Sequence, residues 1–199
     1  MLGYVVGAGK TASMIMGAYE QIRLGKATKC MFAVPNHITK QFAHDIYSLY
    51  PDAKALIVTD KDFEKSNRQR FLSRIAFSDV NMIVIGHSQF ERIMMSPIYQ
   101  KRIIEKQIDD ILSAISQVQM EKGERFTIKQ LEAEKKKLET KIEKLMDTSK
   151  KDSFITFEEL GIDSIFIDEA HNYKNCAVFS KMRNVAGIGN SDSQKAMDM

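Results

Sequence analysis

The sequence predicts an α/β fold with a mostly parallel sheet flanked by helices. Short apolar runs rich in β-branched residues recur along the 199-residue chain, and stretches with helical periodicity separate them. These stretches have ordinary lengths for the crossovers that join parallel strands. The four runs predicted as strands are Cys30–Val34, Ala55–Thr59, Val80–Ile85 and Ser164–Ile167.

The helices between these strands are predicted from apolar spacing and from the residues that start and stop them. The first runs from about Thr11 to Leu24, where Gly25 is placed to end it. A second follows Pro35 and stops before Pro51, because proline cannot continue a helix. Two more are predicted between Asp60 and Ala76 and between Ser88 and Met94.

A long helical segment interrupts the alternation before the last strand. Ser96 and Pro97 are a typical N-cap and first helical residue, and the helical pattern breaks only at Glu121–Arg125. A second helix from about Thr127 has a seven-residue apolar repeat, with Lys135 in one inward position. We therefore expect residues 96–151 to form an inserted antiparallel helical hairpin, with residues 1–95 and 152–199 forming the α/β part. The repeating apolar residues are Ile104, Ile108, Ile111, Ile115 and Val118, then Leu131, Leu138, Ile142 and Leu145.

A glycine-rich run at the start of the first helix predicts a phosphate-binding loop. Gly7, Ala8 and Gly9 let backbone N–H groups converge on an anion, and the helix N-terminus adds partial positive charge. Lys10 then reaches the β and γ phosphates, and the Thr11 hydroxyl can bind Mg²⁺. A glycine-rich turn that happens to precede a lysine is the alternative interpretation.

A second motif follows the last predicted strand. Asp168 and Glu169 come directly after it, and carboxyl ends of parallel strands meet at one edge of a sheet. Asp168 can hold Mg²⁺ near the phosphates bound by Lys10 and Thr11, and Glu169 can orient or deprotonate an attacking water. A helix N-cap is the alternative for this acidic pair. Together the two motifs predict an ATP-binding site.

The chain resembles a known family at these and two further motifs. They look like motifs I, Ia, Ib and II of superfamily 2 helicases, and within that superfamily they are most similar to the Swi/Snf-like DNA translocases. That group commonly has another residue where a strict phosphate-loop pattern has glycine, and here Tyr4 stands at that position. The motifs are Gly7–Thr11, Val34–Asn36 with Gln41–Phe42, Val84–His87 and Asp168–His171.

Other segments resemble the large helicase-like proteins of bacterial conjugative elements, plasmids and phages. Those proteins often join such an ATPase to an adenine-specific DNA methyltransferase, so a fused methyltransferase is an implied partner. The resemblance runs from about Val5 to Gly187, and the surroundings of Asp168 are its most specific part. The segments are Phe126–Thr127 with the helix after it, Phe157–Gly161, His171–Asn175 and Lys181–Gly187.

The resemblance implies the first, ATP-binding RecA-like lobe of a DNA-dependent ATPase with ATP and Mg²⁺ as cofactors. His171 would couple the nucleotide site to the other lobe, and Pro35 and Asn36 would begin a loop that touches the backbone of double-stranded DNA. A catalytic role is not extended to the other histidines, which are His37, His44 and His87.

Superfamily 2 enzymes also have a Ser/Thr-Ala/Gly-Thr-Pro element after motif II and a second RecA-like lobe that supplies arginines. No proline follows Asp168 in this sequence, and only 28 residues follow His171. The chain therefore looks like part of a first lobe. We expect negligible ATP turnover from it alone, because such arginines contribute roughly 10³ to 10⁵ in rate.

Composition and charge narrow the remaining classes. Hydrophobic residues make up 44% and charged residues 28%, which is typical of a globular protein, and the apolar runs are too short to span a membrane. Two cysteines are too few for a disulfide framework and the N-terminus shows no signal-segment pattern, so a cytoplasmic location is expected, and the resemblance implies a bacterial one. The net charge is +3, and the segment Ile98–Lys151 holds 13 Lys and Arg against 10 Asp and Glu.

All of the excess positive charge thus lies on the predicted hairpin, with Lys135, Lys136 and Lys137 at its centre as candidates for contact with nucleic acid. Two other functions stay open. One is a chromosome-maintenance type ATPase, which also places a coiled coil between the two motifs. The other is a non-catalytic module whose hairpin binds DNA or protein.

Overall fold

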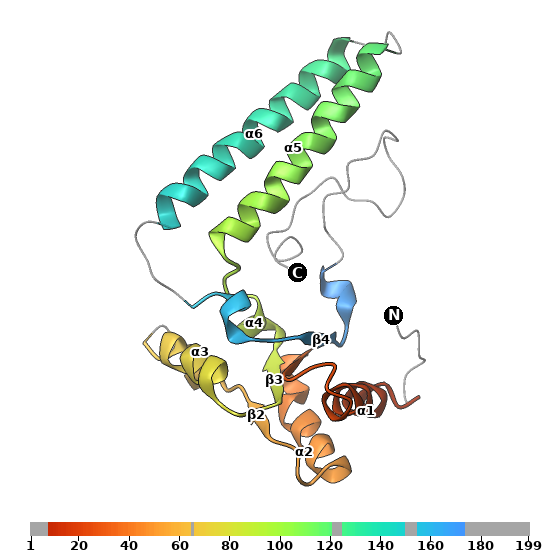
Figure 1. The fold of residues 1–199 in the computed structure, drawn as a ribbon, viewed down its shortest axis with the longest axis vertical. Helices are drawn as coiled ribbons and strands as arrows, with labels where there is room; N and C mark the ends of the chain where they lie inside the picture. The colour runs from red at the N-terminus through yellow and green to blue at the C-terminus, as the bar shows by residue number, and fades with distance from the viewer. Residues whose placement is uncertain (1–7, 65, 121–124, 150–154, 174–199) are drawn as a thin grey trace. The chain divides into compact units, whose positions relative to one another are not determined.

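A computed structural model describes residues 8–64, 66–120, 125–149 and 155–173 (Figure 1). The described chain divides into two compact units. One unit contains residues 8–94 and 155–173, and the other contains the long helices within residues 95–149. Among all the residues that the structure describes, no helix is both long enough and apolar enough to cross a membrane.

The first unit is built on a sheet of four parallel strands. They are β1 (Cys30–Val34), β2 (Ala55–Ile57), β3 (Met82–Gly86) and β4 (Ser164–Ile167), in the spatial order β2-β3-β1-β4. Val34 is aligned with Gly86 on one side of β1, and Ala33 is aligned with Ile167 on the other. The predicted α/β fold with a parallel sheet is confirmed, and it is consistent with a RecA-like lobe.

Short helices and turns connect these strands. Gly25, with φ of 68°, follows the end of the first helix as predicted, because glycine accepts the left-handed conformation at little cost. The α-helices are α1 (Lys10–Arg23), α2 (Thr39–Leu49), α3 (Arg68–Phe77) and α4 (His87–Phe90). The 3₁₀ turns are η1 (Asn36–Ile38), η2 (Asp60–Phe63), η3 (Phe157–Leu160) and η4 (Ala170–Tyr173).

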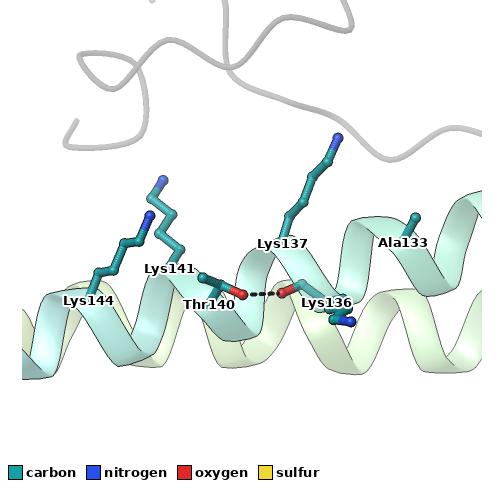
Figure 2. Close-up of a pocket in the computed structure, with 6 residues that line it drawn as sticks. All are labelled: Ala133, Lys136, Lys137, Thr140, Lys141 and Lys144. Atoms are coloured by element: carbon teal, nitrogen blue, oxygen red, sulfur yellow. Dashed lines mark hydrogen bonds between the residues drawn. The ribbon is translucent and has the colours of Figure 1, made fainter.

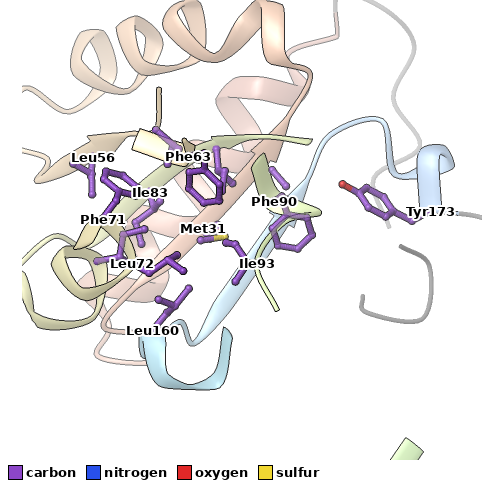
Figure 3. Packing of buried hydrophobic residues seen from close by; sticks show 14 residues of the cluster. Met31, Leu56, Phe63, Phe71, Leu72, Ile83, Phe90, Ile93, Leu160 and Tyr173 are labelled. Carbon is purple, nitrogen blue, oxygen red and sulfur yellow. The ribbon is translucent and has the colours of Figure 1, made fainter. Parts of the chain in front are cut away.

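Each face of the sheet has its own apolar cluster. Because side chains alternate along a strand, Cys30, Phe32 and Val34 pack against α1 and α2. Met31 and Ala33 lie in the other cluster, together with side chains of α3, α4 and η3. Figure 3 shows this second cluster, in which Met31 lies among Phe63, Phe71, Leu72 and Leu160. The central strand β1 is therefore fully buried on both faces.

The structure differs from the sequence prediction most clearly between Asp60 and Ala76. The region forms the short turn η2 and then α3, instead of one helix. The reason is local, since the Thr59 backbone N–H donates to the Asp62 carboxylate and the Thr59 side-chain oxygen accepts from the Asp62 backbone N–H, which closes a capping box over a single turn. The second and third predicted strands are also shorter or shifted at their ends, and α4 begins at His87 instead of Ser88.

The second unit contains two long antiparallel helices, α5 (Pro97–Met120) and α6 (Arg125–Ser149) (Figure 1). The backbone N–H of Tyr99 donates to the Ser96 hydroxyl at 3.2 Å, so Ser96 caps α5 as predicted. Ile111, Ala114 and Leu131 are buried between the helices, and members of the predicted apolar repeats pack against them. Lys135 is half-buried and pairs with Glu139 through its ammonium at 3.4 Å.

The buried Lys29, directly before β1, forms hydrogen bonds to α3 and η3 at the end of the sheet opposite the predicted nucleotide site. The Lys29 ammonium donates to the carbonyls of Ile75 at 2.7 Å, Ala76 at 3.2 Å and Leu160 at 3.4 Å. It thereby satisfies carbonyls at the C-terminal end of α3, where no backbone N–H is available within the helix. The neighbouring Asp163 carboxylate accepts from Thr28 and from the Lys29 backbone, and these hydrogen bonds, the Thr28 hydroxyl first, lower the pKa of Asp163.

We expect Lys29→Met to destabilise the protein by about 2–3 kcal/mol, because the variant keeps the apolar stem and leaves the carbonyls without their charged donor. Chemical denaturation followed by circular dichroism measures this loss. Lys26→Met, at an exposed position three residues earlier, is the control and should change the free energy of unfolding by less than about 0.5 kcal/mol. Equal stability of the two variants would contradict the assigned role of Lys29.

Candidate functional site

The candidate site lies at the carboxyl edge of the parallel sheet. The registers that align Val34 with Gly86 and Ala33 with Ile167 make β1, β3 and β4 end at nearly the same level. The backbone N–H of Asp168 donates to the Ala33 carbonyl at 2.9 Å and so continues the ladder one residue past β4. The residues that follow the three strands are consequently presented together at one edge.

The N-terminus of α1 is open toward an anion. Gly9 is the N-cap, with φ of 80°, and has no side chain to cap the first backbone N–H groups. The N–H of Ser13 donates to the Gly9 carbonyl at 3.0 Å, so the N–H groups of Lys10 and Thr11 precede the first intrahelical bond. A Cβ on Gly9 would meet no atom within 4 Å, and the positive φ is what favours glycine here. Ala8 is exposed beside it, and Gly7 lies outside the described residues.

The structure brings Lys10 and Glu169 together from opposite ends of the described chain. The Lys10 ammonium lies 3.9 Å from the Glu169 carboxylate, and the two side chains are 33% and 42% exposed. An ion pair this accessible contributes little to stability, because water screens it and the side chains lose entropy. Its value is positional, since it aligns the start of α1 with the turn after β4.

That turn has an uncommon backbone geometry. Glu169 has φ of 52°, a left-handed conformation that side chains other than glycine seldom adopt. The Asp168 carboxylate accepts from the Glu169 N–H at 3.0 Å, and the Asn172 N–H donates to the Glu169 carbonyl at 3.1 Å. The Nδ1 atom of His171 lies 3.0 Å from Oε2 of Glu169, whereas the Lys10 ammonium faces the other carboxylate oxygen, Oε1. Glu169 thus lies between Lys10 and His171 and is paired with both. These are three of the four predicted catalytic residues.

Two residues predicted to bind magnesium, Thr11 and Asp168, each carry one oxygen-bearing side chain. Within the described ranges no three His, Cys, Asp or Glu side chains gather into a metal-binding group. Thr11 is the second residue of α1 and Asp168 follows β4, and both are half-buried. Mg²⁺ commonly uses one or two protein oxygens and completes its shell with water and substrate phosphates. One hydroxyl and one carboxylate match that pattern.

A second constellation joins the ends of β1 and β3. The Asn36 amide donates to the Ser88 hydroxyl at 2.5 Å, and the Ser88 backbone N–H donates to the Asn36 side-chain oxygen at 3.2 Å. Gly86 allows this approach, because a Cβ there would lie 2.5 Å from the Asn36 oxygen and 2.4 Å from the Gln89 side-chain oxygen. Pro35 directly precedes the turn that carries Asn36. The loop predicted to touch DNA is thereby fixed to the end of β3.

Sequence reasoning missed the hydrogen bond between His87 and Tyr173. The Nδ1 atom of His87 lies 2.8 Å from the Tyr173 hydroxyl, and the residues are 9% and 6% exposed. The Phe90 ring packs edge-on against Tyr173 at a centroid distance of 6.1 Å. Burial, together with the charge of Glu91, raises the pKa of Tyr173 to about 12, so the phenol keeps its proton. The available signal was that His87 directly follows a strand at the same edge as Asp168.

The lysines proposed from sequence for nucleic acid, Lys135, Lys136 and Lys137, lie on α6 in the second unit.

We expect Gly86→Ala and Gly17→Ala to change stability in opposite directions. The new methyl group at position 86 would meet Asn36 and Gln89 well inside contact distance, and its cost should be about 1–3 kcal/mol. At position 17, inside α1, the methyl group would lie 3.6 Å from Phe166, and better helix propensity should add up to about 1 kcal/mol. Denaturant titration of both variants checks this, and two losses of equal size would contradict the steric account.

The comparisons with known proteins agree with this architecture at the level of the family. Residues 1–199 match the family described as "Probable helicase domain". No curated protein and no solved structure matches the sequence. Because the match covers the whole chain, the chain belongs to the probable helicase domain family.

Proposed function

We propose that this helicase-type domain is the ATP-binding RecA-like lobe of a superfamily 2, Swi/Snf-like DNA translocase that couples ATP hydrolysis to movement on double-stranded DNA. One observation carries the proposal. Lys10, at the start of α1, and Glu169, after β4, face each other at 3.9 Å across the carboxyl edge of a parallel sheet. Phosphoryl transfer needs a cation for the phosphates and a carboxylate for the attacking water at one place.

The residues of the α1 N-terminus would hold the nucleotide. The N–H groups that follow Gly9 and the Lys10 ammonium would bind phosphate oxygens, with Gly7 and Ala8 completing the loop. Thr11 and Asp168 would bind Mg²⁺, which supplies neutralisation of charge on the phosphates. The Lys10 ammonium would bind phosphate oxygens in place of the Glu169 carboxylate, and Glu169 would then be available to the attacking water.

Glu169 would act on the attacking water, and His171 would position Glu169. A carboxylate accepts a proton or a hydrogen bond from water only when one oxygen faces the water. His171 holds one carboxylate oxygen at 3.0 Å, which leaves the other, the one nearest Lys10, directed at the phosphate side. His171 is 66% exposed, which suits a residue that also meets a second RecA-like lobe.

Further partners follow from the same proposal. A second lobe would supply the arginines that complete the ATP site, and an adenine-specific DNA methyltransferase would be fused to the motor. Membership of the protein in mobile elements of bacteria and a cytoplasmic location belong to this proposal too. The Asp168-to-Tyr173 turn supports a translocase over a chromosome-maintenance type ATPase, because His171 has no role in the latter.

We expect Lys10→Ala to weaken binding of a fluorescent ATP analogue with Mg²⁺ by about 10–100-fold, because one charge-assisted phosphate contact contributes about 1.5–3 kcal/mol. Glu169→Gln should retain binding, since its carboxylate is assigned to the water. Titration of the 199-residue chain measures both. Lys26→Ala is the charge-matched control at an exposed position after α1. Unchanged affinity of Lys10→Ala relative to this control would contradict the proposed nucleotide site.

The same edge of the sheet offers a physical link between ATP and DNA. Asn36, in the loop proposed to touch DNA, is bonded to Ser88, and the adjacent His87 is bonded to Tyr173. Tyr173 ends the short turn that begins one residue after Glu169. Movement of the Asn36 loop would therefore be transmitted to Glu169 through the Asn36–Ser88 and His87–Tyr173 hydrogen bonds and one turn.

We expect Tyr173→Phe to reduce the factor by which duplex DNA changes nucleotide affinity at least about threefold, because mutations along a coupling route typically remove 0.5–2 kcal/mol. The affinities for DNA alone and for nucleotide alone should change little. Fluorescence titrations of the analogue with and without duplex give the factor. Tyr47→Phe, which also loses one hydroxyl hydrogen bond, to the Ala55 carbonyl at 3.0 Å, is the control. Equal coupling factors in the two variants would contradict the link.

A further inference from the structure

The helix α6 separates positive from negative charge on its two flanks. Lys137, Lys141 and Lys144 follow one another at spacings of four and three residues, so they lie on one face of the helix. Figure 2 shows these three side chains extending to the same side of α6. Lys137 and Lys144 are exposed, and Lys141 is half-buried. We call these three residues the basic flank.

Acidic residues occupy the opposite flank. Glu132, Glu139 and Glu143 are spaced by seven and four residues, and all three are exposed. Residues two apart in a helix point in nearly opposite directions, since each residue turns the chain by about 100°. Glu139 and Glu143 therefore lie across the helix from Lys137 and Lys141. Two acidic residues border the basic flank, Glu134 one turn before Lys137 and Asp147 three residues after Lys144, so the flank runs from Lys137 to Lys144.

The three consecutive lysines singled out in the sequence are divided by this geometry. Lys135 is half-buried and engaged with Glu139 at 3.4 Å, on the acidic side of the helix. Lys136 extends away from the three residues of the basic flank (Figure 2). Only Lys137 of the three belongs to that flank, so the candidate surface begins at Lys137 and extends from there about two turns toward the C-terminal end of α6.

The basic flank also has the shape of a shallow contact surface. A groove runs along it, and its described lining consists of Ala133, Lys136, Lys137, Thr140, Lys141 and Lys144. Thr140 is short, and its hydroxyl donates to the Lys136 carbonyl at 2.9 Å, so it keeps close to the helix between the longer lysine side chains. A polyanion can thus approach the helix backbone between the ammonium groups.

We infer that the basic flank of α6 binds the phosphate backbone of double-stranded DNA. The three lysines span about 10 Å along the helix axis, at a rise of about 1.5 Å per residue. Phosphates of one strand of a duplex follow one another at about 3.4 Å along the axis, so three phosphate steps cover the same length as this row of three ammonium groups. Lysine contacts phosphate as a point charge, and the contact would be independent of base sequence.

The charge separation also gives the contact a direction. Glu132, Glu139 and Glu143 would repel phosphates, so the duplex would lie along one flank of α6 and be excluded from the other. The inference rests on the proposed function in taking duplex DNA as the polyanion. It goes beyond that function by assigning a DNA contact to three particular residues outside the ATPase unit.

The test compares two triple variants of the 199-residue chain with the same change of charge on the same pair of helices. One is Lys137→Gln, Lys141→Gln, Lys144→Gln, and the other, which leaves the lining of the groove intact, is Lys106→Gln, Lys129→Gln, Lys135→Gln. Anisotropy of a fluorescent DNA duplex is titrated at several salt concentrations. We expect the first variant to lose at least about tenfold in affinity and to lower the salt slope by about 2–3, because each phosphate contact contributes about 0.9 to the slope. The second should lose less than about threefold.

Circular dichroism checks that both variants are folded. Lys and Gln have similar helix propensity, so both variants should keep wild-type helicity. Equal losses in the two variants would overturn the basic flank while leaving DNA as the partner. No loss in either would do the same. Failure of the unmodified chain to bind the duplex would overturn DNA as the partner itself, and with it the proposed translocase.

Discussion

The parallel pairing of β1 with β3 and β4 is the constraint on which the candidate site depends. β1 is buried on both faces and bonded along both edges, so its register fixes where its neighbours end. Every residue assigned to chemistry in the first unit follows one of these strand ends or begins α1. The sheet therefore brings together the residues that follow β1, β3 and β4, and the Lys10–Glu169 ion pair aligns the start of α1 with them.

Much of the fold follows from local patterns, since strands rich in β-branched residues and helices with repeating apolar residues carry their own signals. The division of the region after β2 into η2 and α3 escaped prediction, because a Thr59–Asp62 capping box competes with helical periodicity over one turn. The long helices are predictable from the sequence. Ser96 marks the start of α5, and the seven-residue apolar repeat marks the face of α6 that packs against α5.

The candidate site was predictable in its residues and less so in its contacts. Lys10 and Glu169 were paired because both follow from the chemistry of phosphate, and the sheet sets them 3.9 Å apart. The sequence predicts no catalytic role for His87, because it does not show which buried side chain lies beside that histidine. Its bond to Tyr173 depends on the order of strands, with β1 lying between β3 and β4, and strand order is a property of the whole fold.

At Glu169 the left-handed backbone conformation lowers the stability of the fold, while the carboxylate at the same position is needed for the proposed reaction. A side chain in this conformation costs about 1–2 kcal/mol relative to the right-handed region, and glycine would avoid most of that cost. Glycine has no carboxylate to offer Lys10 or His171. Laboratory evolution for a higher melting temperature alone would therefore favour removing the very group that the proposed chemistry needs, so thermostability and activity should be selected together in this protein.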